Sequence, residues 1–422
     1  MDLMKDNLLT TAITAGAGIL ALWYYGHEQR MEDQKKLDAL MARARVLEET
    51  VEKLTKTVQA LREKTLTADD SDAQLKTLNA SLLGLGEASV KIGTRDSELA
   101  MWQAKHVNAI VKDAYKIKTA IVGMKTLGDL DLKSSLSSFS NKGVFTKELD
   151  AALLLGEVDI AVHSMKDLPT TLEEGLALCA VLERGSIEDA VVLNSTLKEE
   201  GKVKSLDDLP KGAVIGTSAL RRRAILSKHY PHLNVKDVRG NLQTRFKKLD
   251  SKQYDALVLA RTGLERLKMH DRIDQILDSS KFGYAVSQGA LAVVCRSTDK
   301  RMMSLFLPLN HVPTRLRTTA ERALLRSLEG GCKVPIAVKT DYDSAKQTMT
   351  MQGWVVSLDG QKVCHATVTD APVPLSLEKG LEAAKAVGLT VAEALRKEGA
   401  EAILAACRGD NMGHTPPPSK TK

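Results

Sequence analysis

The sequence predicts an α/β fold with several domains from residue 88 onward. Short apolar runs alternate there with longer helical patterns, and the runs are bounded by Gly, Ser or Thr. A helical pattern at residues 99–114 follows the first run, and such alternation is typical of largely parallel sheets. The chain has 422 residues, 43% of them hydrophobic, so it can bury several cores. The apolar runs are residues 89–94, 158–163, 213–217 and 255–260.

Composition and charge weigh against several functions. The formal net charge is +7, from 60 Lys+Arg against 53 Asp+Glu, an excess that matters only where it is concentrated. Aromatic residues make up 4% of the chain, which leaves few platforms for stacking single-stranded nucleic acid. The five cysteines are far apart and lack CxxC spacing. This pattern predicts a reducing compartment and no metal site.

Residues 1–30 are predicted to be a membrane anchor. Residues 7–26 contain no charged side chain, and a helix of that length spans about 30 Å, the thickness of a bilayer hydrocarbon core. Trp23 and the two tyrosines after it lie where an aromatic belt would be. More basic residues follow the span than precede it, which predicts that the rest of the chain faces the cytoplasm. A cleaved targeting segment and a soluble helix are the alternatives.

Residues 31–66 are predicted to form a coiled coil. Apolar residues from Leu37 to Leu61 are spaced alternately three and four residues apart, which is the a/d pattern of four heptads. Leucine at the d positions, with valine at two a positions, favours a parallel homodimer through residues 37–64. A single amphipathic helix lying on its own protein is the alternative. Residues 67–88 are polar and then glycine-containing, and are predicted to be a linker.

Arginines gather where the apolar runs end. Residues 216–223 (GTSALRRR) place three arginines near the start of a helix, and residues 239–245 (RGNLQTR) repeat the design. Backbone N–H groups at helix starts bind anions, and the planar guanidinium pairs with carboxylate or phosphate in bidentate fashion. The sequence therefore predicts a polyanionic substrate. A solvated basic face is the alternative, and the chain lacks the glycine-rich signatures of nucleotide binding.

One acid and one cysteine are candidates for chemistry. Asp167 follows Lys166 in a turn fixed by Pro169, and a carboxylate held near cations can stabilise a developing positive charge or move protons. Cys332 follows two glycines, whose lack of side chains lets a large group approach the sulfur. The alternatives are a turn or cap residue for Asp167 and a buried, inert cysteine for Cys332.

These stretches together resemble the porphobilinogen deaminase family, from about residue 90 to residue 404. The resemblance implies two periplasmic-binding-protein-like domains plus a small α+β C-terminal domain that bears the cofactor. The implied boundaries are residues 88–183 with 289–307, residues 188–283 and residues 312–410. We expect residues 411–422 to be a disordered tail. The blocks that carry the resemblance, in family order, are IGTRDSELAMWQA, NKGVFTKELDAAL, DIAVHSMKDLPT, VIGTSALRRRA, RGNLQTRFKKLD, SQGALAVVCR and LEGGCKVPIA.

The resemblance also implies an activity and a set of site residues. The family joins four porphobilinogens head to tail into hydroxymethylbilane, with release of ammonia, in haem biosynthesis. Cys332 would hold the dipyrromethane cofactor by a thioether, and Asp167 would stabilise the cationic pyrrole nitrogens. Lys142 matches the lysine of an active-site loop, and Gln288 and Gly289 match a hinge segment. The residues that match cofactor-binding and substrate-binding groups of the family are Arg95, Ser97, Lys166, Thr217, Ser218, Arg221, Arg222, Arg239, Arg245 and Arg266.

The chain departs from the family pattern at three positions and at its front. Ser138 stands where many members have a second loop lysine, Ser287 replaces a glycine, and Leu127 replaces a more polar residue. Residues 1–88 lie outside the family. We expect an anchored enzyme whose catalytic domains lie in the cytosol. The alternatives are a catalytically silent binding protein, against which Asp167 and Cys332 both count, and a basic nucleic-acid binder, against which the low aromatic content counts.

Overall fold

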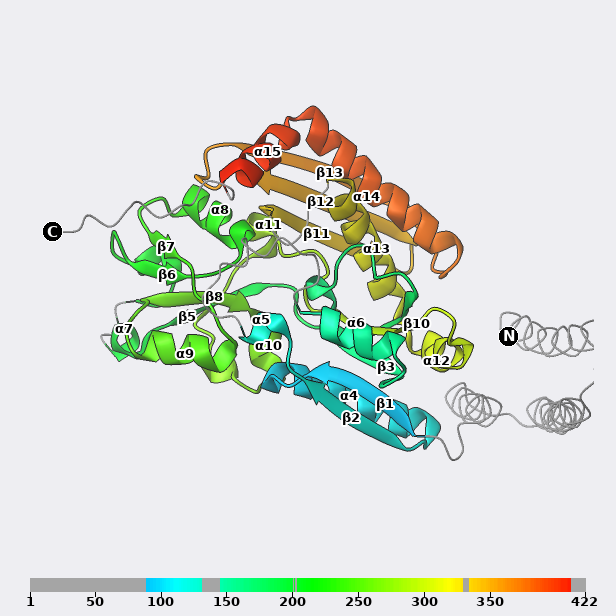
Figure 1. Ribbon diagram of the computed structural model, residues 1–422. Helices are drawn as coiled ribbons and strands as arrows, with labels where there is room; N and C mark the ends of the chain where they lie inside the picture. Colours follow the sequence, from blue (N-terminus) through cyan, green and yellow to red (C-terminus); the bar gives the residue numbers. More distant parts are fainter. Residues whose placement is uncertain (1–88, 131–144, 200, 202, 329–333, 411–422) are drawn as a thin grey trace, which may run out of the picture. The chain divides into compact units, whose positions relative to one another are not determined.

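The computed structural model describes residues 89–130, 145–199, 201, 203–328 and 334–410. Three β-sheets belong to one compact unit of the chain (Figure 1). Two of the sheets have five strands and are mixed, and the third has three antiparallel strands. Several predicted features lie outside the described residues: the anchor, the coiled coil, the linker, the tail, Lys142 and Cys332. Within the described ranges, no helix is both long and apolar enough to cross a bilayer.

The first sheet has the strand order β2-β1-β3-β10-β4. Strands β1, β2 and β3 run parallel, whereas β10 is antiparallel to both of its neighbours. Leu149 and Leu153 of helix α6 pack on one face of the sheet with Ala161, Ala292 and other buried residues. The elements are β1 (Val90–Arg95), α4 (Glu98–Tyr115), β2 (Thr119–Met124), α5 (Leu127–Leu130), α6 (Lys147–Leu154), β3 (Ile160–Ser164), the 3-10 turn η1 (Met165–Asp167), β4 (Leu176–Val181), β10 (Leu291–Arg296), α12 (Lys300–Phe306) and the 3-10 turn η4 (Leu307–Leu309).

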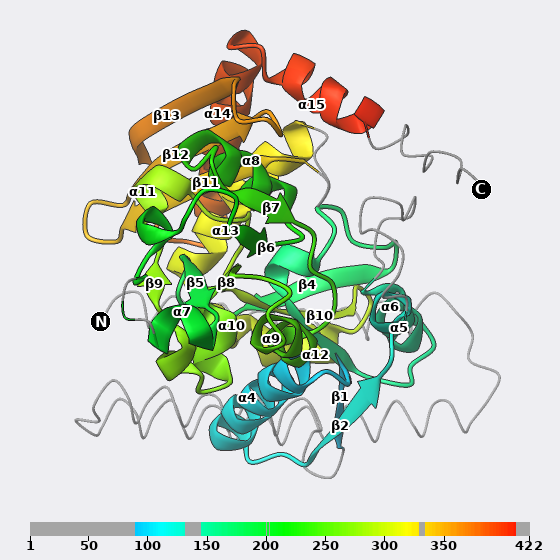
Figure 2. The ribbon, with the colours of Figure 1, turned by 90° about the vertical axis from the view of Figure 1, so that its left-hand side faces the viewer.

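The second sheet has the order β7-β6-β8-β5-β9 and is buried on both faces. Alternate residues of a strand point to opposite faces, so Val191 packs in the core under α8 while Val192 packs in the core under α9. Helices α8 and α9 accordingly lie on opposite sides of the sheet (Figures 1 and 2). The elements are β5 (Asp189–Leu193), α7 (Ser195–Glu199), the 3-10 turn η2 (Leu206–Asp208), β6 (Val214–Gly216), α8 (Leu220–His229), β7 (Asn234–Lys236), α9 (Leu242–Asp250), β8 (Ala256–Ala260), α10 (Arg261–Arg266), the 3-10 turn η3 (His270–Arg272), β9 (Gln275–Ile276) and α11 (Ser279–Phe282).

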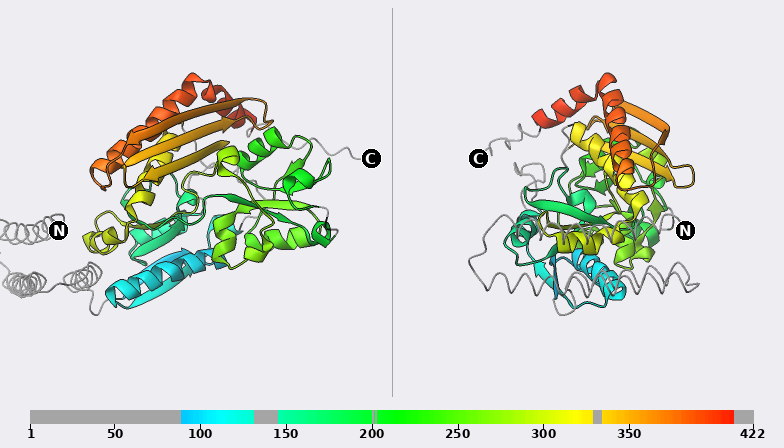
Figure 3. Two further views of the ribbon diagram at one scale, coloured as in Figure 1. Left: turned by 180° about the vertical axis from the view of Figure 1, so that it is seen from behind. Right: turned by 90° about the vertical axis from the view of Figure 1, so that its right-hand side faces the viewer.

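The third sheet is an antiparallel meander covered by helices on one face. Helix α14 runs along this face (Figures 1 and 3) and contacts β12, β13 and α13. On the other face, Ala337 and Val356 pack in the same core as α8 of the second sheet. The elements are α13 (Val312–Ser327), β11 (Ile336–Asp343), β12 (Thr348–Val356), β13 (Val363–Pro372), α14 (Lys379–Lys397) and α15 (Ala400–Asp410).

The prediction of largely parallel sheets holds in part. Six strands of the first two sheets make parallel pairs, whereas β4, β5, β9 and β10 make only antiparallel pairs. Strand β5 is antiparallel to β8, and β10 is antiparallel to β3 and β4. Both are strands at which the chain enters one sheet after leaving the other, since β5 follows β4 and β10 follows β9. An apolar run of residues carries no signal of strand direction, so the sequence could not reveal this. The four apolar runs themselves are confirmed as strands β1, β3, β6 and β8.

Candidate functional site

The candidate site lies at the edge where parallel strands end and the two antiparallel strands begin. The strand register pairs Ser164, the last residue of β3, with Leu291, the first residue of β10. In the second sheet it pairs Ala260, at the end of β8, with Asp189, at the start of β5. Segments that are far apart in the sequence therefore reach the same edge of each sheet. Most of the predicted site residues lie in these segments.

A buried carboxylate, that of Asp189, holds two of the predicted arginines. Arg221 donates a hydrogen bond from Nη2 to Oδ2 at 2.7 Å, and Arg222 donates from Nη2 to Oδ1 at 2.8 Å. Gln288 donates from Nε2 to the same Oδ1 at 2.9 Å, which ties the segment before β10 to the second sheet. All four side chains are buried, and Nε of Arg222 has no hydrogen-bond partner. The arrangement therefore retains a donor for an anion.

The charges in this cluster shift the pKa values of its members. Burial alone would raise the pKa of Asp189, but Arg221 and Arg222 hold it well below the usual carboxyl range. Lys166, on the turn η1, is close enough to feel the charges of Asp189, Arg221 and Arg222. Burial and Arg222 lower the pKa of Lys166 to about 8, although Asp167 and Asp189 act in the opposite direction. Lys166 is therefore charged at neutral pH and loses its charge in mildly alkaline solution.

Asp167, the predicted catalytic carboxylate, ends the 3-10 turn η1 and is partly buried. Its charge acts to raise the pKa of Lys166 and that of Arg245. One carboxylate at the end of the first sheet thus interacts with a cation on its own turn and with a cation from the second sheet. The structure brings together these residues, which the sequence separates by about eighty positions.

Arg239 and Arg245 lie on either side of the start of helix α9. Asn241 caps this helix with its side chain, and Gly240 adopts a φ of +109°, which suits a residue without a Cβ. Arg245 donates from Nε to the carbonyl oxygen of Gly240 at 2.8 Å. Burial, Arg222 and Arg239 lower the pKa of Arg245 to about 10. Three arginines from two helix starts are therefore close enough to repel one another, which favours binding of an anion between them.

Thr217 and Ser218 fix the loops that carry these arginines. The backbone N–H of Thr217 donates to the carbonyl oxygen of Lys236 at 3.0 Å, and its hydroxyl accepts from the N–H of Ala219 at 3.3 Å. The hydroxyl of Ser218 donates to the carbonyl oxygen of Val238. The two residues hold the end of β6 against the segment after β7, so that the arginines before α9 and at the start of α8 stay close.

Gln288, Gly289 and Arg266 define the segment that returns the chain to the first sheet. Gly289 has a φ of +87°, and a Cβ there would lie 2.6 Å from the carbonyl oxygen of Gly185, so only glycine fits. Arg266 donates to the carbonyl oxygen of Gly289 and Arg184 donates to that of Gln288, each at 2.7 Å. In this structure Arg266 therefore holds the returning segment, a role that the motif did not reveal.

A cavity of about 260 Å³ lies beside Arg266. The guanidinium of Arg266 lies 5.6 Å from the ring centroid of Trp102, which in turn stacks on His106 at 5.2 Å. Burial and Arg266 lower the pKa of His106, which favours the neutral imidazole. The cavity joins α4 and α10 to the returning segment and belongs to the same site region.

Arg95 and Ser97 lie at the end of β1, and Arg95 is paired within the protein. Its Nε donates to Oδ2 of Asp129 at 3.0 Å, and a second bond joins Nη2 to Oδ1. The guanidinium also lies 4.3 Å from the ring centroid of Phe145. Ser97 accepts from the N–H of Ala100 at 3.4 Å. The predicted anion-binding role of Arg95 would require this ion pair to open or to be shared.

Sequence reasoning missed Asp189 and Asp129. Each is an acid that neutralises an arginine predicted to bind an anion. Asp189 opens an apolar run (DAVVL), and an acid at that position was the available signal, since a charged residue at the start of a buried strand needs a partner. The short stretch around Asp129 (LGDL) carried no comparable signal.

The fold and site define a class of protein: an α/β enzyme with a carboxylate set among buried arginines and lysine at the edges of two sheets. Two family models match the chain. They are "Porphobilinogen deaminase, dipyromethane cofactor binding domain" over residues 90–304 and "Porphobilinogen deaminase, C-terminal domain" over residues 315–397. The chain belongs to the porphobilinogen deaminase family, whose function is in tetrapyrrole biosynthesis.

Curated relatives match over most of the chain. A porphobilinogen deaminase of Synechococcus elongatus is 47% identical over 75% of this chain and 94% of its own length. One of Nostoc sp. is 44% identical over 77% of this chain and 96% of its own length. Among solved structures, the periplasmic VFT2 domain of Bordetella pertussis BvgS is 15% identical, covers 52% of this chain and 86% of its own, and gives a TM-score of 0.34. That score is too low to support a conclusion about fold or function.

Proposed function

We propose that this enzyme condenses four porphobilinogens head to tail into hydroxymethylbilane, with Asp167 as its catalytic carboxylate. The observation that carries the proposal is the placement of Asp167 beside Lys166 and Arg245. Each porphobilinogen brings two carboxylates and one nitrogen that becomes cationic during the reaction. A site with several cations and one opposed carboxylate matches both demands. Membership of the deaminase family supports the assignment independently.

The cations would bind and orient the carboxylates of the growing chain. Arg222 has a buried Nε without a hydrogen-bond partner, and Lys166 is charged at neutral pH. Arginine keeps its proton at neutral pH, so its charge stays the same throughout the reaction. Asp189 orients Arg221 and Arg222, and Nη1 of Arg222 also donates to the carbonyl oxygen of Val258 at 3.0 Å. The Nε of Arg222 is left for substrate. The site is thus organised before substrate binds.

Asp167 would act on the charge that develops at a pyrrole nitrogen. A carboxylate held close to that nitrogen lowers the energy of the cationic transition state, because the stabilisation is strongest where solvent is excluded. The same carboxylate could accept or return the proton of the nitrogen during coupling. Lys166 and Arg245 attract the carboxylate of Asp167 and repel a positive ring, so the stabilisation of that ring would come from Asp167 itself.

The residues present fit the cofactor named by the family model. A dipyrromethane carries four carboxylates, and the excess of cations with the unpartnered Nε of Arg222 suits such a group. Cys332 would hold it by a thioether, in the stretch between α13 and β11. When bound, the cofactor supplies the free pyrrole carbon on which the chain grows. Gln288 and Gly289 would let the two sheets adjust as the bound chain lengthens.

The direct test is turnover by the purified full chain. Incubation with porphobilinogen should release one ammonia per pyrrole consumed and should give a linear product that cyclises to uroporphyrinogen I. Ammonia and the oxidised porphyrin are measured separately. Porphobilinogen binding without ammonia release would contradict the proposal and would favour a silent binding protein.

The front of the chain would place this enzyme at a membrane. The uncharged stretch at residues 7–26 supports an anchor, and the heptads support a parallel homodimer through residues 37–64. With the basic residues after the span, the catalytic part would face the cytoplasm. Deleting residues 1–88 should then keep turnover but abolish membrane association and the dimer. An unchanged mass in solution after the deletion would contradict the coiled coil.

A further inference from the structure

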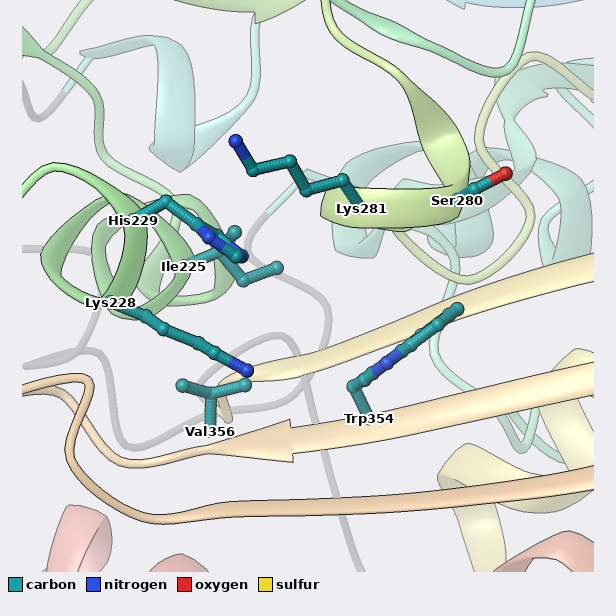
Figure 4. A pocket seen from close by; sticks show the side chains of 7 residues that line it. All are labelled: Ile225, Lys228, His229, Ser280, Lys281, Trp354 and Val356. Carbon is teal, nitrogen blue, oxygen red and sulfur yellow. The ribbon is translucent and has the colours of Figure 1, made fainter.

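A second cationic region lies at the opposite end of helix α8 from the catalytic arginines. It is a cleft of about 210 Å³ between α8, α11 and β12 (Figure 4). Lys228 and His229 project into it from the last turn of α8, and Lys281 projects from α11. Trp354 of β12 lies on the far side (Figure 4). We call this the lysine cleft, and its lining residues are Ile225, Lys228, His229, Ser280, Lys281, Trp354 and Val356.

The lysines of this region have no carboxylate partner among the described residues. Lys228 and Lys281 are exposed and form no ion pair there. Lys281 lies over the rings of Tyr230 and Phe282, 5.4 and 5.5 Å from their centroids. Lys339 of β11 donates to the hydroxyl of Ser280 at 2.8 Å, at the border of the cleft. Three amino groups thus lie in this region with no direct ion pair among the described residues.

Acids on the neighbouring elements are already engaged with the backbone. Asp278 accepts from the N–H of Ser280 at 2.8 Å, and Glu398 accepts from the N–H of His365 at 2.7 Å. Burial, Lys281 and Lys228 lower the pKa of His229, which agrees with a positive potential in the cleft. Both acids keep their negative charge, but neither forms a direct ion pair with Lys228 or Lys281 among the described residues.

The cleft also has an apolar side. Ile225 and Val356 are buried members of the core between the second and third sheets, and Trp354 packs at its border. The ring of His365 stacks on the indole, with 4.8 Å between the centroids and 10° between the planes. A rigid aromatic side chain next to unpaired amino groups suits a ligand with a flat ring and an acidic group. Interactions of the lysines with the C-terminal end of α8 would not explain the neighbouring indole.

We propose that the lysine cleft binds a small aromatic anion, with its ring against Trp354 and its acidic group between Lys228 and Lys281. The volume favours a single ring, because pockets for drug-sized ligands are typically about 300 to 1,000 Å³. A phosphate ester and a carboxylate would share this chemistry. The proposal is independent of the catalytic assignment, since Arg221 and Arg222 lie in the first turn of α8, whereas Lys228 and His229 lie in its last.

The test is acylation of lysines by an N-hydroxysuccinimide ester, read residue by residue by mass spectrometry on the full chain. Phenyl phosphate or benzoate should protect Lys228 and Lys281 but not the exposed Lys385 of α14. Whichever probe protects at the lower concentration identifies the acidic group. Inorganic phosphate and phenol should protect at least tenfold more weakly. Equal protection by inorganic phosphate, or none by either aromatic probe, would overturn the proposal.

Two variants separate binding from folding. In Lys281→Glu, an exposed change, the concentration of the better probe that half-protects Lys228 should rise at least tenfold. The matched variant Lys385→Glu should leave that concentration unchanged. Trp354→Leu should remove the preference for the aromatic probe over inorganic phosphate, with folding checked by thermal denaturation. Unchanged protection of Lys228 in Lys281→Glu would contradict the site even if Trp354→Leu fails to fold.

Discussion

The first two sheets share one strand pattern and present different chemistry at the same edge. In each, three parallel strands are followed by one antiparallel strand that arrives from the other sheet. The first sheet ends in the turn that carries Lys166 and Asp167, whereas the second supplies buried arginines held by Asp189. The difference teaches that the carboxylate proposed for catalysis and the arginines held by Asp189 come from separate sheets. They can therefore be removed one at a time.

Replacing Asp167 should have the largest effect, because it removes what the first sheet contributes to catalysis. In Asp167→Asn we expect kcat to fall by about 10³-fold, the loss typical of one preorganised electrostatic group. The midpoint of thermal unfolding should stay unchanged, since the side chain is partly exposed. Rates of hydroxymethylbilane formation measure the effect. The matched control is Asp250→Asn, which loses only an exposed pair with Arg272. A kcat within tenfold of the parent would reject the role of Asp167.

Replacing Asp189 should remove the ion pairs that hold Arg221 and Arg222 in the second sheet and should lower the stability of the fold. Asp189→Asn leaves two buried arginines without a counter-charge, so the free energy of unfolding should fall by about 3 kcal/mol. Asp250→Asn should cost under about 1 kcal/mol. Because the folded pKa of Asp189 lies below the unfolded value, this stabilisation is present above about pH 4 and is lost as the pH falls through the folded pKa. Denaturant unfolding at several pH values tests both statements, and equal losses in the two variants would contradict them.

Lys166 stands between the two sheets and should make substrate binding depend on pH. Its pKa of about 8 means that the charge is present below that pH and is lost above it. We expect KM for porphobilinogen to rise about tenfold between pH 7 and pH 9.5, the worth of one charged hydrogen bond. Lys166→Arg should flatten this profile, because arginine keeps its proton. The same pH dependence in both proteins would assign it to another group.

Replacing Ser287 should have the smallest effect on stability. Ser287 lies in the segment through which the chain returns to the first sheet before β10. Its φ is +63°, in the region that favours glycine, and its hydroxyl is buried without a hydrogen-bond partner. Ser287→Gly should therefore raise the free energy of unfolding by about 1 kcal/mol. The matched variant Gly289→Ser should destabilise, since a Cβ would lie 2.6 Å from a carbonyl oxygen. Thermal denaturation compares them, and a loss of stability in Ser287→Gly would show that the hydroxyl matters more than the strain.

The sequence predicted the elements well because burial leaves a local pattern. The runs ending at Thr94, Thr217 and Ala260 were apolar, ended in small residues and were followed by helices, and they became strands. The arginines of α8 and α9 were found for a similar reason, since each cluster follows a strand directly. The domain boundaries and the roles of the individual site residues stay predictions.

What the sequence could not give is pairing between distant residues. Nothing local links Asp189 to Arg221, or Asp129 to Arg95, because the partners lie more than thirty positions apart. The lysine cleft was missed for the same reason, since Lys228 lies on α8 and Trp354 lies on β12, far away in the sequence. Strand direction was lost because β5 and β10 have the same apolar composition as their parallel neighbours.

The most direct test of the account is the mass of the peptide that contains Cys332. The chain is purified from cells that make porphobilinogen, its intact mass is measured, and the peptide is mapped. We predict an added mass equal to two linked pyrroles on that cysteine, which would establish the cofactor and with it growth of the product on a bound primer. An unmodified Cys332 would contradict the proposed mechanism and would favour a binding protein that kept the fold and its anion sites.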